Sequence, residues 1–108
     1  MDSEYTYEFT QKALNDLDKI IGYIAEDLLN PTAAKAFYEK VFKKIGVLCS
    51  FPEAGRFVDN KLITDKTVRR FLIDDYILYY KVEIENKVIQ IIDIVYGKIN
   101  LERIYRNI

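Results

Sequence analysis

The sequence contains no histidine and a single cysteine. Without an imidazole the chain cannot build a serine or cysteine catalytic triad, a histidine-ligated zinc site or a histidine general base. We therefore expect no metal site. Cys49 lies between Leu48 and Phe51 and is predicted to be a small buried thiol. Because one cysteine cannot form a disulfide within the chain, a reducing compartment is expected.

Glycine-rich loops and long apolar runs are missing as well. The 4 glycines are too scattered to form a phosphate-binding loop or a dinucleotide fingerprint, so no cofactor is expected. Apolar residues never run to the length of about 18 that a membrane span needs, and the start, MDSEYTYEF, is acidic rather than a signal peptide. These features predict a cytoplasmic protein without a membrane partner.

An excess of positive charge is also absent. The 16 Lys and Arg face 17 Asp and Glu, which gives a net charge of −1. A protein that binds a phosphate backbone over a wide surface usually carries a basic excess. The segment from Lys98 onward is positive, with Lys98, Arg103 and Arg106 against Glu102. Any contact with nucleic acid is therefore expected to be local.

The chain has 108 residues, half of them apolar, which predicts one domain over residues 1–108. Aromatic and polar side chains alternate over residues 4–9, as in a short strand. Thr10 is the expected N-cap of a long amphipathic helix. One apolar stripe follows at helical spacing: Leu14, Leu17, Ile21, Ile24 and Leu28.

A second helix is expected to begin with Asn30 as its cap and Pro31 at its first position. It should end before FPEAGR, residues 51–56, because Pro52 disfavours helix at Phe51 and Gly55 supplies a turn. The short connection makes the two helices antiparallel. The stripe of the second helix is Ala34, Phe37, Val41, Ile45 and Leu48.

Three segments rich in β-branched and aromatic residues follow, at 67–73, 76–84 and 87–95, with a hairpin at residues 85–87. The middle segment has an apolar face that should meet the helices: Leu78, Tyr80, Val82 and Ile84. Its other face is mixed: Ile77, Tyr79, Lys81 and Glu83. The sequence therefore predicts an α+β fold in which an N-terminal strand and an antiparallel helical hairpin precede a C-terminal antiparallel β-meander that packs on the hairpin.

The order of these elements, together with four motifs, resembles the RelE/ParE superfamily of toxins from bacterial type II toxin–antitoxin modules. The motifs are NPTAAKAF at 30–37, FPEAGR at 51–56, DDYILYYKV at 74–82 and IVYGKINLERIY at 94–105. The resemblance extends from Tyr5 to Tyr105. The long hairpin and the first two motifs are more similar to the ParE branch, whose members poison DNA gyrase, than to the RelE branch, whose members cut mRNA on the ribosome.

RelE-type enzymes carry arginines and lysines on the open sheet face and a C-terminal tyrosine. Tyr105 stands at the position of that tyrosine, and Lys98 matches a lysine that directly follows the glycine. Two positions depart from the pattern, since Ile77 and Ile99 occupy places where those enzymes carry arginine. An aliphatic side chain cannot stabilise the charge that grows on a phosphate. Arg69, Arg70 and Lys81 could substitute, but successive residues of one strand place Arg69 and Arg70 on opposite faces.

The resemblance implies a non-enzymatic toxin that binds DNA gyrase through Lys98, Arg103, Tyr105 and Arg106. The alternative is a ribosome-dependent mRNA endonuclease that uses Arg70, Lys81, Lys98 and Tyr105, and a third possibility is a toxin fold that has lost toxicity. In each case we expect a hetero-oligomer with a cognate antitoxin. A flexible antitoxin segment would fold against the helical hairpin and an open sheet edge.

Overall fold

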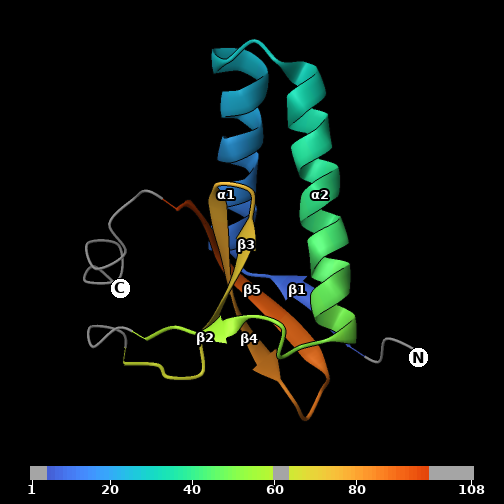
Figure 1. Ribbon diagram of the computed structural model, residues 1–108, viewed down its shortest axis with the longest axis vertical. Coiled ribbons are helices and arrows are strands. Elements are labelled where there is room, and N and C mark those ends of the chain that lie inside the picture. The colour runs from blue at the N-terminus through green and yellow to red at the C-terminus, as the bar shows by residue number, and fades with distance from the viewer. Residues whose placement is uncertain (1–4, 60–63, 98–108) are drawn as a thin grey trace.

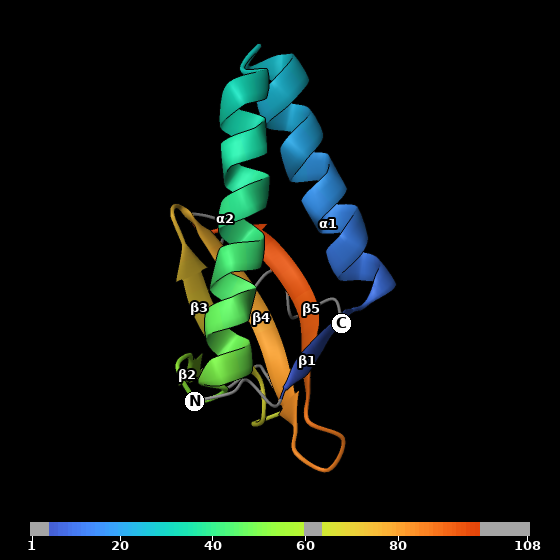
Figure 2. The same cartoon turned by 90° about the vertical axis from the view of Figure 1, so that its right-hand side faces the viewer.

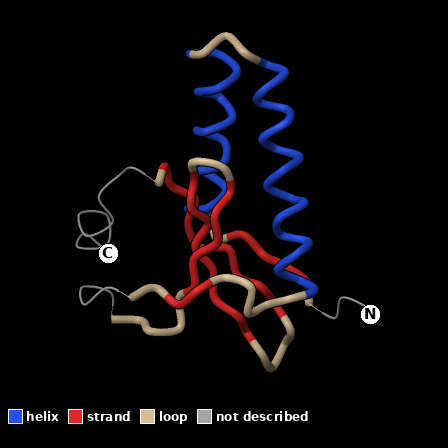
Figure 3. Tube along the Cα trace, viewed as in Figure 1, coloured by secondary structure: helices blue, strands red, loops and turns tan. Residues whose placement is uncertain are grey.

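The computed structural model describes residues 5–59 and 64–97. A five-stranded sheet packs against an antiparallel helical hairpin (Figures 1 and 3). In chain order the elements are β1 (Thr6–Phe9), α1 (Gln11–Gly22), the π-helix η1 (Tyr23–Asp27), α2 (Pro31–Ser50), β2 (Arg56–Phe57), β3 (Arg69–Ile73), β4 (Tyr76–Glu83) and β5 (Val88–Tyr96).

The sheet has the strand order β1-β5-β4-β3-β2. β3, β4 and β5 form the predicted antiparallel meander, and β2 pairs antiparallel with β3. β1 lies beside β5 and runs parallel to it, so the sheet is mixed. The predicted α+β class, helical hairpin and meander are confirmed. The sequence analysis expected neither the parallel pairing of β1 nor the strand β2.

Both helices begin where the caps were predicted. The Thr10 hydroxyl accepts a hydrogen bond from the Ala13 N–H at 3.1 Å, and the Asn30 side chain accepts one from the Ala33 N–H at 3.0 Å. Each bond satisfies an N–H that has no partner within its helix. Pro31 is the first residue of α2, where its missing N–H costs nothing. The capping residues thus fix the start of each helix from local sequence alone.

The predicted apolar stripe of the first helix is wrong at both ends. Leu14 and Leu28 are 42% and 55% exposed, whereas Ala13 and Leu17 are buried. The regular helix ends at Gly22 and continues as a π-helix, which rotates the later side chains away from the expected stripe. The far half of the hairpin also projects beyond the sheet, so side chains near its tip have no sheet to pack against (Figure 2).

The main core lies between the hairpin and the sheet. Four residues of the predicted α2 stripe lie in it with Leu78 and Tyr80 of β4: Phe37, Val41, Ile45 and Leu48. The fifth, Ala34, is buried as well. Ile84 was expected on the same face but lies beyond the end of β4 and is 73% exposed. A second, smaller apolar cluster lies on the other face of the sheet and contains Val58, Val68, Ile77 and Tyr79.

Candidate functional site

The sheet face that points away from the helices, here called the open face, carries two of the predicted site residues. Arg70 is the register partner of Tyr79, and Lys81 lies two residues further along β4. Because side chains alternate along a strand, Arg70, Tyr79 and Lys81 share this face. Arg69 is the register partner of Tyr80, which belongs to the helix-side core. The prediction that Arg69 and Arg70 lie on opposite faces is confirmed.

The surroundings of Lys81 limit what it can do. Its ammonium forms an ion pair with Asp65 at 2.9 Å. Hydrogen bonds from Lys81 and Thr67 hold the pKa of Asp65 far below its ordinary value, so this partner stays charged. Ile77 is 4% exposed and packs in the apolar cluster of the open face instead of presenting a charge. Arg70 is therefore the one predicted catalytic cation on this face, within the described residues, that no ion pair engages.

The other predicted site residues, Lys98, Arg103, Tyr105 and Arg106, lie outside the described residues. The last described residue is Gly97, whose N–H donates to the Asp75 carbonyl at 2.7 Å. A Cβ on Gly97 would meet this carbonyl at 3.0 Å. The end of the described part, at Gly97, is therefore held tightly against the β3–β4 turn.

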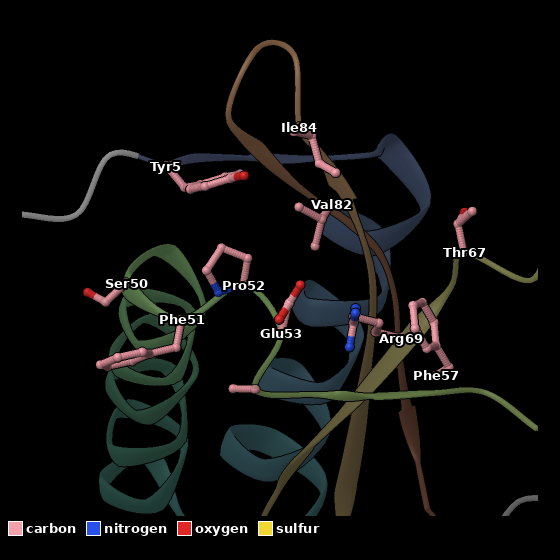
Figure 4. Close-up of a pocket in the computed structure, with 11 residues that line it drawn as sticks. Tyr5, Ser50, Phe51, Pro52, Glu53, Phe57, Thr67, Arg69, Val82 and Ile84 are labelled. Atoms are coloured by element: carbon pink, nitrogen blue, oxygen red, sulfur yellow. The ribbon is translucent and has the colours of Figure 1, made fainter.

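A hollow of about 830 Å³ lies at the C-terminal end of α2 (Figure 4). Phe51, Phe57 and Ile84 line it and are 65%, 54% and 73% exposed. The Arg69 guanidinium stacks 3.8 Å from the Phe57 ring centroid and donates to the Gly55 carbonyl at 2.7 Å. The hollow thus combines apolar side chains with one oriented cation. Sequence reasoning missed it, although two phenylalanines that flank a proline–glycine turn were a visible signal.

Tyr80 fixes the loop that forms one wall of this hollow. Its hydroxyl, on a fully buried side chain, accepts a hydrogen bond from the Gly55 N–H at 2.9 Å and donates one to the Pro52 carbonyl at 2.8 Å. Burial raises the pKa of Tyr80, so the phenol remains protonated and able to donate. A Cβ on Gly55 would lie 2.6 Å from this hydroxyl, so only glycine fits there.

A cluster of three ionisable groups joins α1 to β5. Lys12 forms ion pairs with Asp93 at 2.7 Å and with Asp16 at 3.2 Å, and Asp16 accepts the Ile94 N–H at 3.1 Å. Burial and the hydrogen bond with Asp16 raise the pKa of Asp93 to about 6. Burial also opposes ionisation of Asp16, but its hydrogen bonds with Asp93, Ile94 and Lys12 outweigh this and lower its pKa. The cluster therefore attaches α1 to β5 over the part of the strand that does not pair with β1.

The described ranges bring no three Asp, Glu or Cys side chains close enough together to hold a metal ion. None of the helices in the described part of the chain is apolar over a length that would cross a bilayer.

Comparison with known proteins gives a family match over nearly the whole chain. The family described as "ParE toxin of type II toxin-antitoxin system, parDE" matches residues 7–107. No curated protein sequence gives a significant match. A solved structure titled as a chromosomal ParDE system from P. aeruginosa has a TM-score of 0.70 at 20% identity and covers 90% of this chain and 100% of its own.

RelE-type structures are similar too. The toxin–antitoxin complex RelBE2 from Mycobacterium tuberculosis has a TM-score of 0.59 at 25% identity and covers 85% of this chain and 96% of its own. The isolated E. coli RelE toxin has the same TM-score at 20% identity and covers 96% of this chain and 99% of its own. The backbone fold is thus common to both branches, and the choice between them depends on the side chains.

Proposed function

The chain belongs to the ParE family of type II toxin–antitoxin toxins, and from this premise we propose that it acts by binding DNA gyrase and is neutralised by a cognate antitoxin. In this role the protein is a binding toxin and not a nuclease. Lys98, Arg103, Tyr105 and Arg106 are proposed to contact the target, because the segment from Lys98 onward is basic, with three cations against Glu102, in a chain whose net charge is −1.

The single observation that favours a binding toxin is the set of side chains on the open face of the sheet. Cleavage of RNA through its own 2′-hydroxyl needs a proton acceptor and several cations that stabilise the charge on the phosphate. At position 77, where the resemblance places an arginine in RelE-type enzymes, an isoleucine is buried in the apolar cluster. Lys81 is neutralised by Asp65. Of the predicted catalytic cations in the described part of this face, only Arg70 is free of an ion pair, so a binding toxin is favoured over a nuclease.

The position of Arg70 and Lys81 on one face supports the mRNA endonuclease as a second candidate. In that reading Arg70 and Lys81 would hold the phosphate, and Lys98 and Tyr105 would complete the site on the ribosome. Asp65 would have to release Lys81 before it could act. The double variant Arg70→Ala and Lys81→Ala separates the two candidates, because it abolishes toxicity only where these cations are catalytic.

The target class is tested by induced expression followed by pulse labelling of DNA and of protein. A gyrase-binding toxin stops DNA synthesis first while protein synthesis continues, and the purified protein inhibits supercoiling of relaxed plasmid by gyrase. The Arg70→Ala, Lys81→Ala double variant serves as the matched control and should remain toxic. Immediate arrest of translation, with cuts in ribosome-bound mRNA that disappear in the double variant, would replace the proposal with the nuclease.

The proposed role of the segment from Lys98 onward, here called the tail, is tested by two substitutions of Tyr105. Tyr105→Phe removes only the hydroxyl, whereas Tyr105→Ala also removes the ring. If the tail binds a partner through several contacts, the Phe variant remains toxic and the Ala variant weakens binding by about 1–2 kcal/mol. A proton-transfer role for the hydroxyl would instead reduce the rate by about 100-fold or more in the Phe variant.

A further inference from the structure

The turn that joins η1 to α2 places a leucine in the left-handed region of the backbone, because Leu29 has a φ of 51°. Two hydrogen bonds hold this turn. The Leu28 N–H donates to the Tyr23 carbonyl at 3.0 Å, and the Asn30 N–H donates to the Ile24 carbonyl at 3.1 Å. A left-handed residue at the end of a helix is usually glycine and sometimes asparagine, because a longer side chain is strained there. Leu29 therefore raises the conformational energy of the free chain.

The side chain of Leu29 is also exposed to solvent. At 83% it is the most exposed of the large apolar side chains in the described residues, and Leu28 beside it is 55% exposed. An apolar side chain stabilises a fold by leaving water, and Leu29 gains very little in this way within the described chain. A residue that is unfavourable in both conformation and exposure is typical of a binding site, where contacts with a partner compensate for the strain.

The two leucines belong to the far end of the hairpin, here called the hairpin tip and defined as residues 26–30. The tip projects beyond the sheet along the longest axis of the molecule (Figures 1 and 2). A flexible peptide segment binds by filling a groove, so it offers no pocket that could enclose a projecting side chain. A folded partner can enclose one, and an aliphatic anchor buried in a pocket is a usual centre of a protein interface. The shape of the tip therefore favours a large folded partner.

The charged side chains of the tip are acidic. Glu26 and Asp27 end η1, and both are exposed. Neither forms an ion pair with another residue of the described part of the chain. Such a surface repels nucleic acids and anionic membranes, and it attracts a protein surface that carries Lys and Arg. An enzyme that binds DNA has a surface of this kind, because it neutralises phosphates.

We propose that the hairpin tip is a target contact, in which Leu28 and Leu29 enter an apolar pocket bordered by Lys and Arg on the DNA-binding surface of gyrase. This assignment rests on the proposed binding of gyrase and adds a second part of the fold to the contacts of the tail. The strain and the exposure of Leu29 persist in the free toxin, and the contact with gyrase covers its side chain. Glu26 and Asp27 lie at the border of the pocket, where opposite charges orient the two proteins.

The substitution Leu29→Gly separates the contact from the fold. It relieves the strain and removes the side chain, so the free toxin should melt no lower than the wild type. The toxin concentration that halves supercoiling by gyrase should rise at least about tenfold, the loss expected when a buried leucine is removed. Leu29→Met keeps an apolar side chain and should retain inhibition. A clear fall in the melting temperature of Leu29→Gly would show that the turn does not strain Leu29.

A matched control makes the same backbone change at a different turn. Lys87 has a φ of 54° and lies between β4 and β5, far from the hairpin tip along the chain. Lys87→Gly therefore also relieves a left-handed residue, and it should leave the inhibition of gyrase unchanged. An equal loss of inhibition in Lys87→Gly and Leu29→Gly would overturn the assignment of the contact to the tip.

A charge reversal tests the acidic border of the tip. Asp27→Lys should raise the half-inhibiting concentration at least about threefold at low salt, mainly through slower association, and the difference should shrink at high salt. A cation in the last turn of a helix interacts favourably with the helix dipole, so this change should not weaken the fold. Asp18→Lys makes the same change of charge at an exposed position of α1 and should leave inhibition unchanged. An equal loss in both variants would overturn the role of the acidic border.

The outcomes separate the two proposals. If the wild-type toxin neither binds gyrase nor inhibits it, the proposed function and the tip contact both fall. If it inhibits gyrase and Leu29→Gly inhibits equally well, only the tip contact falls. Two results would assign the tip to another occupant and would also overturn the contact with gyrase. One is loss of antitoxin binding in Leu29→Gly with inhibition intact, and the other is a wild-type dimer in sedimentation equilibrium that becomes a monomer in Leu29→Gly with inhibition intact.

Discussion

Replacing Tyr80 with phenylalanine removes one oxygen atom that holds the loop after α2 in place. The hydroxyl accepts from the Gly55 N–H at 2.9 Å and donates to the Pro52 carbonyl at 2.8 Å, and the ring is fully buried in the main core. The phenylalanine ring occupies the same space, so no cavity larger than the missing oxygen forms. The change therefore isolates two hydrogen bonds from the packing of the ring.

The expected loss of stability follows from the two backbone groups that would lose the hydroxyl as their hydrogen-bond partner. A buried donor or acceptor without a partner costs about 1–3 kcal/mol. Gly55 is buried, so its N–H carries this penalty, whereas Pro52 is only half-buried and water can reach its carbonyl. We therefore expect Tyr80→Phe to lower the free energy of unfolding by about 1–3 kcal/mol in total. For a domain of this size each kcal/mol lowers the melting temperature by roughly 4–8 °C.

Urea unfolding of the wild type and the variant measures this loss directly. The midpoint should fall while the slope of the free energy against urea concentration stays constant, because the surface exposed on unfolding is the same. Tyr38→Phe is the control, since Tyr38 is 49% exposed and its substitution should change the free energy by no more than about 0.5 kcal/mol. If Tyr80→Phe proved as stable as the control, the loop would not depend on this hydroxyl and the reasoning would be refuted.

Three other substitutions give independent checks. Gly55→Ala should lower the melting temperature more than Tyr80→Phe does, because its Cβ would lie 2.5 Å from the Arg70 carbonyl, and an unchanged melting curve would contradict this. Asn30→Ala removes the cap of α2 and should lower the free energy of unfolding by about 1 kcal/mol in urea. The pKa of Asp93 is raised to about 6 in the folded chain, so its contribution to stability is present below pH 4 and is lost as the pH rises through about 6. Thermal melts from pH 4 to 7 should show this fall in the wild type and its absence in Asp93→Asn.

Features that depend on neighbouring residues were predictable from the sequence. The caps Thr10 and Asn30, the buried stripe of α2 and the antiparallel meander all follow from spacing over a few positions. The first helix was predicted less well, because nothing in its periodicity marks the change to a π-helix at Tyr23.

Features that depend on distant residues were not predictable. The parallel pairing of β1 joins Thr6 to Val88, and no local pattern in the short segment 4–9 identifies β5 as its neighbour. β2 contains only two residues and exists because β3 offers an edge for it. For the candidate site, alternation placed Arg70 and Lys81 on one face, but the ion pair of Lys81 with Asp65 requires the path of the preceding loop.

The parallel pairing of β1 with β5 determines the order in which the elements of the chain can fold. The helical hairpin needs only contacts between residues close in sequence, so it can form early. β1 is synthesised first, yet Thr10, which follows it, donates its N–H and its hydroxyl to the carbonyls of Ile91 and Ile92. A nascent chain that lacks β5 therefore has neither a complete sheet nor a closed core. The described part of the chain completes its sheet only when β5 has been made, and until then β1 lacks the strand with which it pairs.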